Sequence, residues 1–180
     1  MSKTPKDLPL LLEILDEGYN RRAWHGPNLR QALRGISAEA AAWRPAPARH
    51  NIWEITVHAA YWKYCLRRRW RGEKRGSFTL RGSNWFKRPE ELSEAAWRAD
   101  LALLDAEHEL LRQAVVDCLR GKIRPTSRRL VFGVALHDIY HAGQIRLLRR
   151  LQERIRGGRQ TRRHLGSGLS RDRAAARLHW

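Results

Sequence analysis

The sequence has few cysteines and no long hydrophobic run. Its 180 residues include only two cysteines, Cys65 and Cys118, which are too few for a disulfide framework or for a metal site built from thiolates. No apolar stretch approaches the length needed to span a bilayer, and the N-terminal residues do not fit a signal peptide. These absences predict a cytoplasmic protein with no membrane segment.

Acidic residues are also scarce relative to basic ones. The chain has 18 Asp and Glu against 36 Lys and Arg, and its formal net charge is +18 at pH 7. Such an excess favours nucleic acid and other acidic partners in a non-specific way. The basic residues are scattered, however, and no recognition helix, zinc finger or RNA-binding signature accompanies them. We therefore expect no specific nucleic-acid partner. A basic protein that binds nucleic acid through its arginines is kept as one alternative function.

Strand signals are weak, because β-branched residues are few and alternation of apolar and polar residues rarely persists. Apolar residues recur instead at helical spacing between recognisable breakers. The expected helical segments are 7–17, a continuation through 29–36, 37–43, 51–71, 93–119 and about 126–154, the last capped by Thr126 or Ser127. The chain is too short for two ordinary domains, so this pattern predicts one all-α domain over residues 1–156.

Capping residues and glycines set the limits of these segments. Asn51 with Glu54 three positions later resembles a capping box, and Gly72 is placed to end the same helix. Residues 72–92 are expected to form a long loop, which in a compact domain usually covers or builds a functional site. The last helix is expected to end at Gly157-Gly158. Residues 157–180 are therefore predicted to be a basic, Gly- and Arg-rich tail that is disordered or loosely packed.

Three histidines lie on apolar stripes of two predicted helices. His58 shares its stripe with Ile55, Trp62 and Cys65, whereas His137 and His141 share theirs with Leu130, Val134, Ile145 and Leu148. A spacing of four residues places two side chains about 40° apart around a helix and roughly 6 Å apart along it. Two such imidazoles can bind one metal ion, and a third from a facing helix completes the set. From spacing alone, a hydrogen-bonded core histidine is an equal alternative.

Five further residues are candidates for the surroundings of the site. Asp138 and Gln144 could orient a ligand histidine or a substrate, although Asp138 could equally be an exposed acid paired with an arginine. Trp62 is expected to line the pocket. His25 either lines the site or marks a helix break, and His108 is interpreted as a core or boundary histidine, with hydrogen bonding to a metal ligand as the alternative.

Four short motifs resemble the DinB/YfiT-like family. The run HDIYHAGQI at residues 137–145 is similar to the C-terminal signature of that family, and NIWEITVH at residues 51–58, followed by Trp62, is similar to its second-helix motif. WHGPNL at residues 24–29 and GSNW at residues 82–85 also look like family features. The resemblance covers about residues 8–152, and its two His-bearing motifs occur together and in the family order.

The resemblance implies a four-helix bundle with up-down-down-up topology. It also implies one divalent metal ion, zinc or nickel, on His58, His137 and His141, all of which are present. Family members with assigned activities include thiol-dependent S-transferases and a mycothiol-dependent maleylpyruvate isomerase. The implied function is therefore a metal-dependent thiol S-transferase or hydrolase that acts on a small electrophile, with a low-molecular-weight thiol as co-substrate. A non-catalytic metal-binding stress protein is the alternative, and a homodimer is a further expectation.

Overall fold

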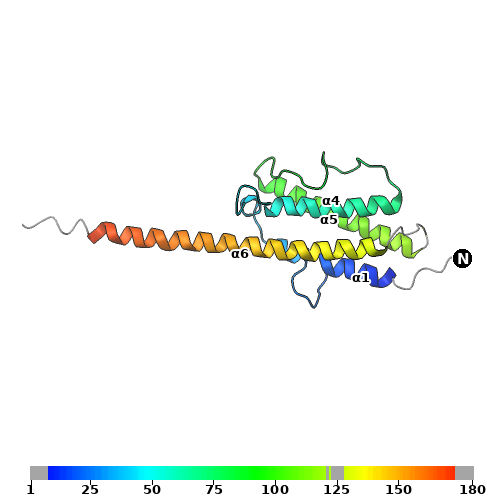
Figure 1. The fold of residues 1–180 in the computed structure, drawn as a ribbon, viewed down its shortest axis with the longest axis horizontal. Coiled ribbons are helices and arrows are strands. Elements are labelled where there is room, and N and C mark those ends of the chain that lie inside the picture. Colours follow the sequence, from blue (N-terminus) through cyan, green and yellow to red (C-terminus); the bar gives the residue numbers. More distant parts are fainter. Residues whose placement is uncertain (1–7, 121, 123–127, 173–180) are drawn as a thin grey trace, which may run out of the picture.

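The computed structural model describes residues 8–120, 122 and 128–172, and its regular structure there is entirely helical (Figure 1). The helices are α1 (Leu8–Tyr19), α2 (Leu29–Leu33), α3 (Ala38–Ala42), α4 (Ile52–Arg71), α5 (Glu94–Leu119) and α6 (Arg128–Asp172). The four long helices pack together, while α2 packs on α6 and α3 packs on α4 and α5. The predicted all-α class is confirmed.

A long loop between α4 and α5 determines how these two helices are oriented. Figure 1 shows this loop returning the chain to the end at which α4 begins, so that α4 and α5 run in the same direction and α1 and α6 in the opposite one. Residues 72–93 contain no helix or strand, as predicted. Phe78 and Phe86 fix the loop to the core, where both rings pack against Tyr61 of α4. The loop therefore lies against the face of α4 that carries Tyr61.

Asn51 and Gly72 cap α4 as the sequence predicts, but the reciprocal bond of the predicted capping box is not formed, because the Glu54 carboxylate pairs with Arg44 and His50 instead. The Asn51 side chain accepts a hydrogen bond from the backbone N–H of Glu54 at 2.7 Å, which satisfies one of the free donors of the first turn. Gly72 ends the helix with φ of 67°, a left-handed conformation that glycine adopts at little cost. The predicted N-cap of the last helix, Thr126 or Ser127, lies outside the described residues.

The predicted end of the last helix at Gly157-Gly158 is wrong. Helix α6 continues through both glycines to Asp172, and Figure 1 shows its C-terminal part extending beyond the other helices. Each glycine inside a helix costs about 1 kcal/mol relative to alanine. The residues around them are rich in arginine, glutamine and leucine, which favour helix, and this preference offsets that cost. The predicted separation of a tail from the bundle at residue 156 remains a prediction.

Two clusters of buried apolar side chains form the core. One lies between α2, α3, α4, the beginning of α5 and the middle of α6. In it the buried Trp53 indole packs against Trp97 and donates to Asp100 at 2.6 Å. The other joins α1 and the start of α6 to the ends of α4 and α5, with Leu11 and Leu15 fully buried. Within the described part of the chain, no helix is both long and apolar enough to cross a membrane.

Candidate metal centre

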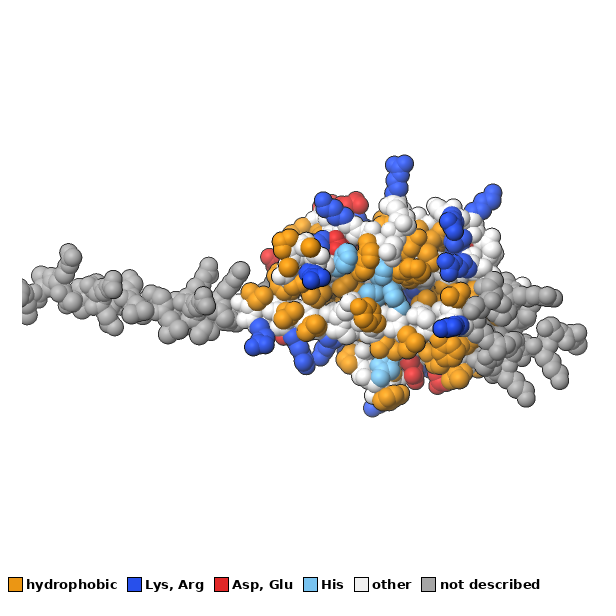
Figure 2. All heavy atoms as spheres, viewed as in Figure 1, with side chains coloured by type: hydrophobic (Ala, Val, Ile, Leu, Met, Phe, Trp, Pro, Cys, Tyr) orange, Lys and Arg blue, Asp and Glu red, His pale blue; other side chains and the backbone are white. Residues whose placement is uncertain are grey.

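Three histidine side chains meet between α4 and α6. His58 projects from the middle of α4, and His137 and His141 come from successive turns of α6. The Nε2 atom of His137 lies 3.1 Å from that of His58 and 3.0 Å from that of His141. All three ligand atoms lie within 4.8 Å of one another, so the three predicted ligands form a group that could hold a metal ion. Figure 2 shows histidine side chains near the middle of one face, among apolar ones.

Hydrogen bonds to the opposite ring nitrogens fix the tautomers of two of these histidines. Nδ1 of His58 donates to the backbone carbonyl of Asn84 at 2.8 Å, and Nδ1 of His141 donates to the side-chain oxygen of Gln144 at 2.7 Å. A neutral imidazole that donates from Nδ1 carries a lone pair on Nε2. Both Nε2 lone pairs are therefore available to bind a cation, as in metal sites where each ligand histidine donates its other N–H to an acceptor.

Burial keeps the three rings neutral. It lowers the pKa of His137 to about 3, together with the charges that His141, His58 and Lys63 would present to it. It also lowers the pKa of His141 to about 4, against the opposing effect of the Gln144 hydrogen bond, and it lowers the pKa of His58. Neutral imidazole is the form that binds metals, so these residues need to lose no proton to act as ligands at pH 7.

The arrangement of these nitrogens fits a bound cation. Nε2 of His58 and Nε2 of His141 both turn a lone pair towards Nε2 of His137 at about 3 Å, and a neutral His137 has at most one Nε2 proton to share between them. In addition, Nδ1 of His137 is buried and has no hydrogen-bond partner among the described residues. A divalent ion would satisfy the lone pairs that the protein itself leaves facing one another.

An aromatic stack holds the His58 ring in place. The Trp85 ring lies parallel to that of His58, with centroids 3.8 Å apart, and its other face stacks on His50 at 3.6 Å. The neighbouring Asn84 has φ of 63°, a left-handed conformation that asparagine tolerates better than most residues, and its carbonyl is the acceptor for His58. Stacking on Trp85 therefore fixes the plane of the His58 ring, and the hydrogen bond to the Asn84 carbonyl fixes its rotation within that plane.

Asp138 lies beside the site but turns away from it. Its carboxylate is fully buried and forms an ion pair with the equally buried Lys63 of α4. The alternative of an exposed acid paired with an arginine is therefore wrong, because the helix turns this position into the core. No hydrogen bond joins Asp138 to a ligand histidine in the described part of the chain, and its Oδ1 atom has no partner there.

The remaining candidates lie at different distances from the three histidines. Trp62 packs edge-on against His58 and His137, each at 6.3 Å between ring centroids, so it lines the site. His108 is buried, stacks on Tyr19 at 3.8 Å, and lies 3.4 Å from the Lys63 amine through Nδ1. His25 lines a separate hollow of about 470 Å³ on another side of α6 and is not in the histidine group.

Sequence reasoning missed His50 and Lys63, and gave no role to Trp85. The GSNW motif at residues 82–85 was a signal for the loop, but nothing in it shows that its tryptophan stacks on a histidine. Lys63 did have a signal, because it is a single lysine inside the apolar run AAYWKYCL of α4. A charged residue buried on such a face needs a partner, which Asp138 supplies.

Comparison with known proteins agrees with the resemblance. The model of the DinB superfamily matches residues 21–145, a span that contains all three histidines and the long loop. Neither the curated proteins nor the solved structures contain a match to this chain. Because the family model covers more than half of the sequence, the chain belongs to the DinB superfamily.

Proposed function

We propose that this protein holds one divalent metal ion, zinc or nickel, on His58, His137 and His141, and that it is a metal-dependent enzyme of the thiol S-transferase type. The observation that carries the proposal is the group of three neutral imidazoles, two buried and one half-buried, whose Nε2 atoms face one another. Three protein ligands, rather than the four of a structural zinc site, are typical of catalytic sites. We place this activity in the cytoplasm.

The ion, when bound, would lower the pKa of a coordinated thiol or water towards 7 and so provide a nucleophile at neutral pH. The residues of the chain keep the ligands ready for it. Asn84 and Gln144 hold the Nδ1 protons of His58 and His141, so that the Nε2 lone pairs remain directed inward. Trp62 and Trp85 lie against the rings and exclude water from one side.

Partial exposure distinguishes His137 from the other two ligands. His58 and His141 are buried, whereas His137 is half-buried, so we place the approach of a substrate on the side of His137. A small electrophile could therefore approach the site without opening of the bundle. This access favours an enzyme over a closed structural metal site.

The test is metal-dependent consumption of a thiol. Protein purified without an affinity tag, loaded with zinc or nickel, is mixed with glutathione and 1-chloro-2,4-dinitrobenzene, and product is followed by absorbance. We expect turnover that a chelator abolishes and added metal restores, while the helical circular-dichroism signal stays unchanged. A rate that is the same in the wild type and in His141→Ala would contradict the proposal. Bound metal without turnover over a panel of thiols and electrophiles would favour the non-catalytic alternative.

A further inference from the structure

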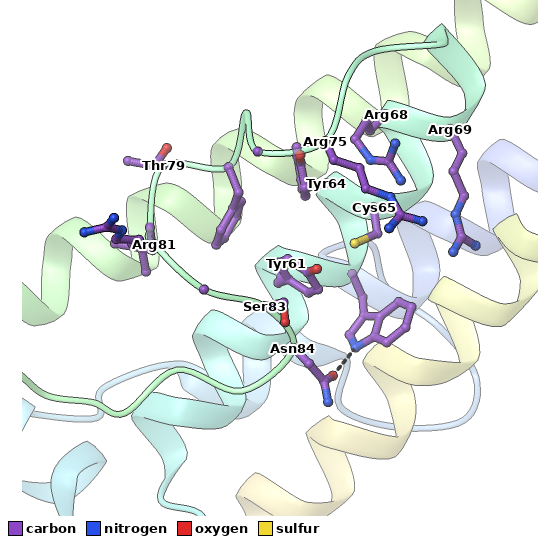
Figure 3. Close-up of a pocket in the computed structure, with 15 residues that line it drawn as sticks. Tyr61, Tyr64, Cys65, Arg68, Arg69, Arg75, Thr79, Arg81, Ser83 and Asn84 are labelled. Carbon is purple, nitrogen blue, oxygen red and sulfur yellow. Dashed lines mark hydrogen bonds between the residues drawn. The ribbon is translucent and has the colours of Figure 1, made fainter.

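A second feature of the molecule, next to the metal centre, is a pocket between α4 and the loop that follows it (Figure 3). Its volume is about 820 Å³, which is within the range of small-molecule sites. Side chains of α4, including Tyr61 and Trp62, form one wall, and loop residues 75–84 form the other. The pocket is therefore open enough for a ligand and has an aromatic wall along which an apolar group can pack.

The charge of this pocket is of one sign. Figure 3 shows Arg68, Arg69 and Arg75 at the same end of it, close to Cys65, with Arg81 farther away. None of the described residues that line the pocket is an aspartate or a glutamate. Among the described residues, no carboxylate pairs with Arg69 or Arg75, both of which are exposed.

The nearest acidic residue of the loop is already in use. The Glu73 carboxylate forms an ion pair with Arg67, whose Nε atom donates to Glu107 on the other side. Arg68 is held by a hydrogen bond of 3.3 Å to the backbone carbonyl of Glu73. Guanidinium groups gathered without a counter-charge repel one another, and an anion between them would relieve this repulsion. Arginine is also the side chain best suited to bind carboxylate, phosphate or sulfonate oxygens in pairs.

The pocket and the metal centre share two residues. Trp62 lines the pocket, and its ring packs against His58 and His137. Asn84 also lines the pocket: its side chain accepts a hydrogen bond from the Trp62 indole at 3.1 Å, and its backbone carbonyl accepts one from His58. A molecule in this pocket therefore lies one side chain away from the metal ligands.

We propose that this pocket binds the anionic end of the small molecule that reacts at the metal centre, with Arg68, Arg69 and Arg75 as its counter-charges. The substrate or the thiol is accordingly an organic carboxylate, phosphate or sulfonate whose apolar part packs along Tyr61 and Trp62. This assignment of substrate class rests on the proposed function, whereas anion binding by the pocket does not.

The test uses naphthalene-1-sulfonate and its neutral counterpart naphthalene-1-sulfonamide as probes of equal size. Binding to the metal-loaded wild type, to R69Q/R75Q and to the control R129Q/R154Q is measured by isothermal titration calorimetry. Both variants lose the same charge, and the control arginines are exposed residues of α6 outside the pocket. We expect the sulfonate to bind at least tenfold more tightly than the sulfonamide, and at least tenfold more weakly to R69Q/R75Q than to the wild type and the control.

Three results would overturn the proposal: equal affinity for the two probes, equal loss in both variants, or no binding to the wild type. A fourth such result would come from a single-stranded oligonucleotide measured beside the probes. If R69Q/R75Q lost more affinity for the oligonucleotide than for the sulfonate, these arginines would be assigned to nucleic-acid binding. The metal content of every sample is determined as well. If the wild type takes up no metal but still binds the sulfonate, the proposed function and the substrate assignment are refuted, whereas anion binding by the pocket is not. The comparison of the two probes on the wild type requires no variant to fold.

Discussion

Substitution of Lys63 by methionine should destabilise the protein more than any surface change of the same charge. Methionine keeps the length of the lysine stem but removes the partner of Asp138, and both side chains are fully buried. Breaking a buried ion pair from one side costs about 3–5 kcal/mol, because it leaves an uncompensated charge in the core. Without Lys63 neither carboxylate oxygen of Asp138 has a partner among the described residues, so the loss should lie within this range.

The same variant should show a characteristic pH dependence. Burial raises the pKa of Asp138 to about 6 even with Lys63 beside it, and Lys63 is the group that lowers it. Without Lys63 the folded carboxyl keeps its proton to higher pH, while the unfolded chain ionises near 4. The unfolded state then binds fewer protons than the folded state, so the stability of the variant falls as pH rises. The deficit relative to wild type should therefore be larger at pH 8 than at pH 5.

Urea unfolding followed by circular dichroism at the two pH values measures both effects. The matched control is Lys122→Met, because the Lys122 side chain is 63% exposed and its contact with Asp117 is 3.9 Å long; its cost should stay within about 0.5 kcal/mol. The double variant K63M/D138L should recover much of the loss, since it removes both charges. A cost below about 1 kcal/mol for K63M, or a deficit that does not change with pH, would refute the reasoning.

Three further predictions concern stability. Gly18→Ala should cost about 1–3 kcal/mol in urea unfolding, because a Cβ atom there would lie 2.9 Å from the backbone oxygen of Ala135 on α6. Burial lowers the pKa of His108 to about 4, so this residue alone should lower stability by roughly 3 kcal/mol between pH 6.5 and 4, in addition to the contributions of His137 and His141. Unfolding of His108→Phe should show a fall that is shallower than that of the wild type by this amount, and an equal fall would contradict the prediction. Deletion of residues 157–180 should leave a cooperative melt, since this segment follows the last described contact of α6 with the bundle core, Leu148 and Gln152; loss of cooperativity would show that it packs into the core.

Local signals were sufficient to predict most of the helices. Asn51, Ser93 and Gly72 mark helix ends through backbone conformation and capping hydrogen bonds, which depend only on neighbouring residues. The end of α6 was not predictable in the same way. Gly157 and Gly158 resemble a stop signal, but the helix preference of the surrounding residues outweighs their cost over a segment of this length.

The metal ligands were predictable because their spacing is local. His137 and His141 share one helix face, and His58 lies on the apolar stripe of another helix. Their supports depend on the tertiary fold. The carbonyl of Asn84 has no side-chain signature, and the contact of Trp85 with His58 requires the loop to fold back over α4. Likewise, the sequence shows a lysine and an aspartate on two helices but not that they meet in the core.

The pocket beside the metal centre shows the same limit. Its arginines come from α4 and from the loop, and in the sequence they look like part of a general excess of basic residues. Only the fold shows that Arg68, Arg69 and Arg75 lie at one end of a pocket while Glu73 pairs with Arg67. A count of charges therefore predicts non-specific binding of acidic partners, whereas the placement of these three arginines in the fold points to the binding of a small anion.

The central claim is that His58, His137 and His141 bind one metal ion. It is tested most directly by the metal content of untagged wild type, His141→Ala and the control His25→Ala, determined by mass spectrometry on samples whose helical content is checked in parallel. His25 lies outside the histidine group, so its loss should leave metal binding unchanged. We predict one divalent ion per chain in the wild type and the control and none in His141→Ala, with the helical signal equal in all three. Metal content that is the same in His141→Ala as in the wild type would contradict the account.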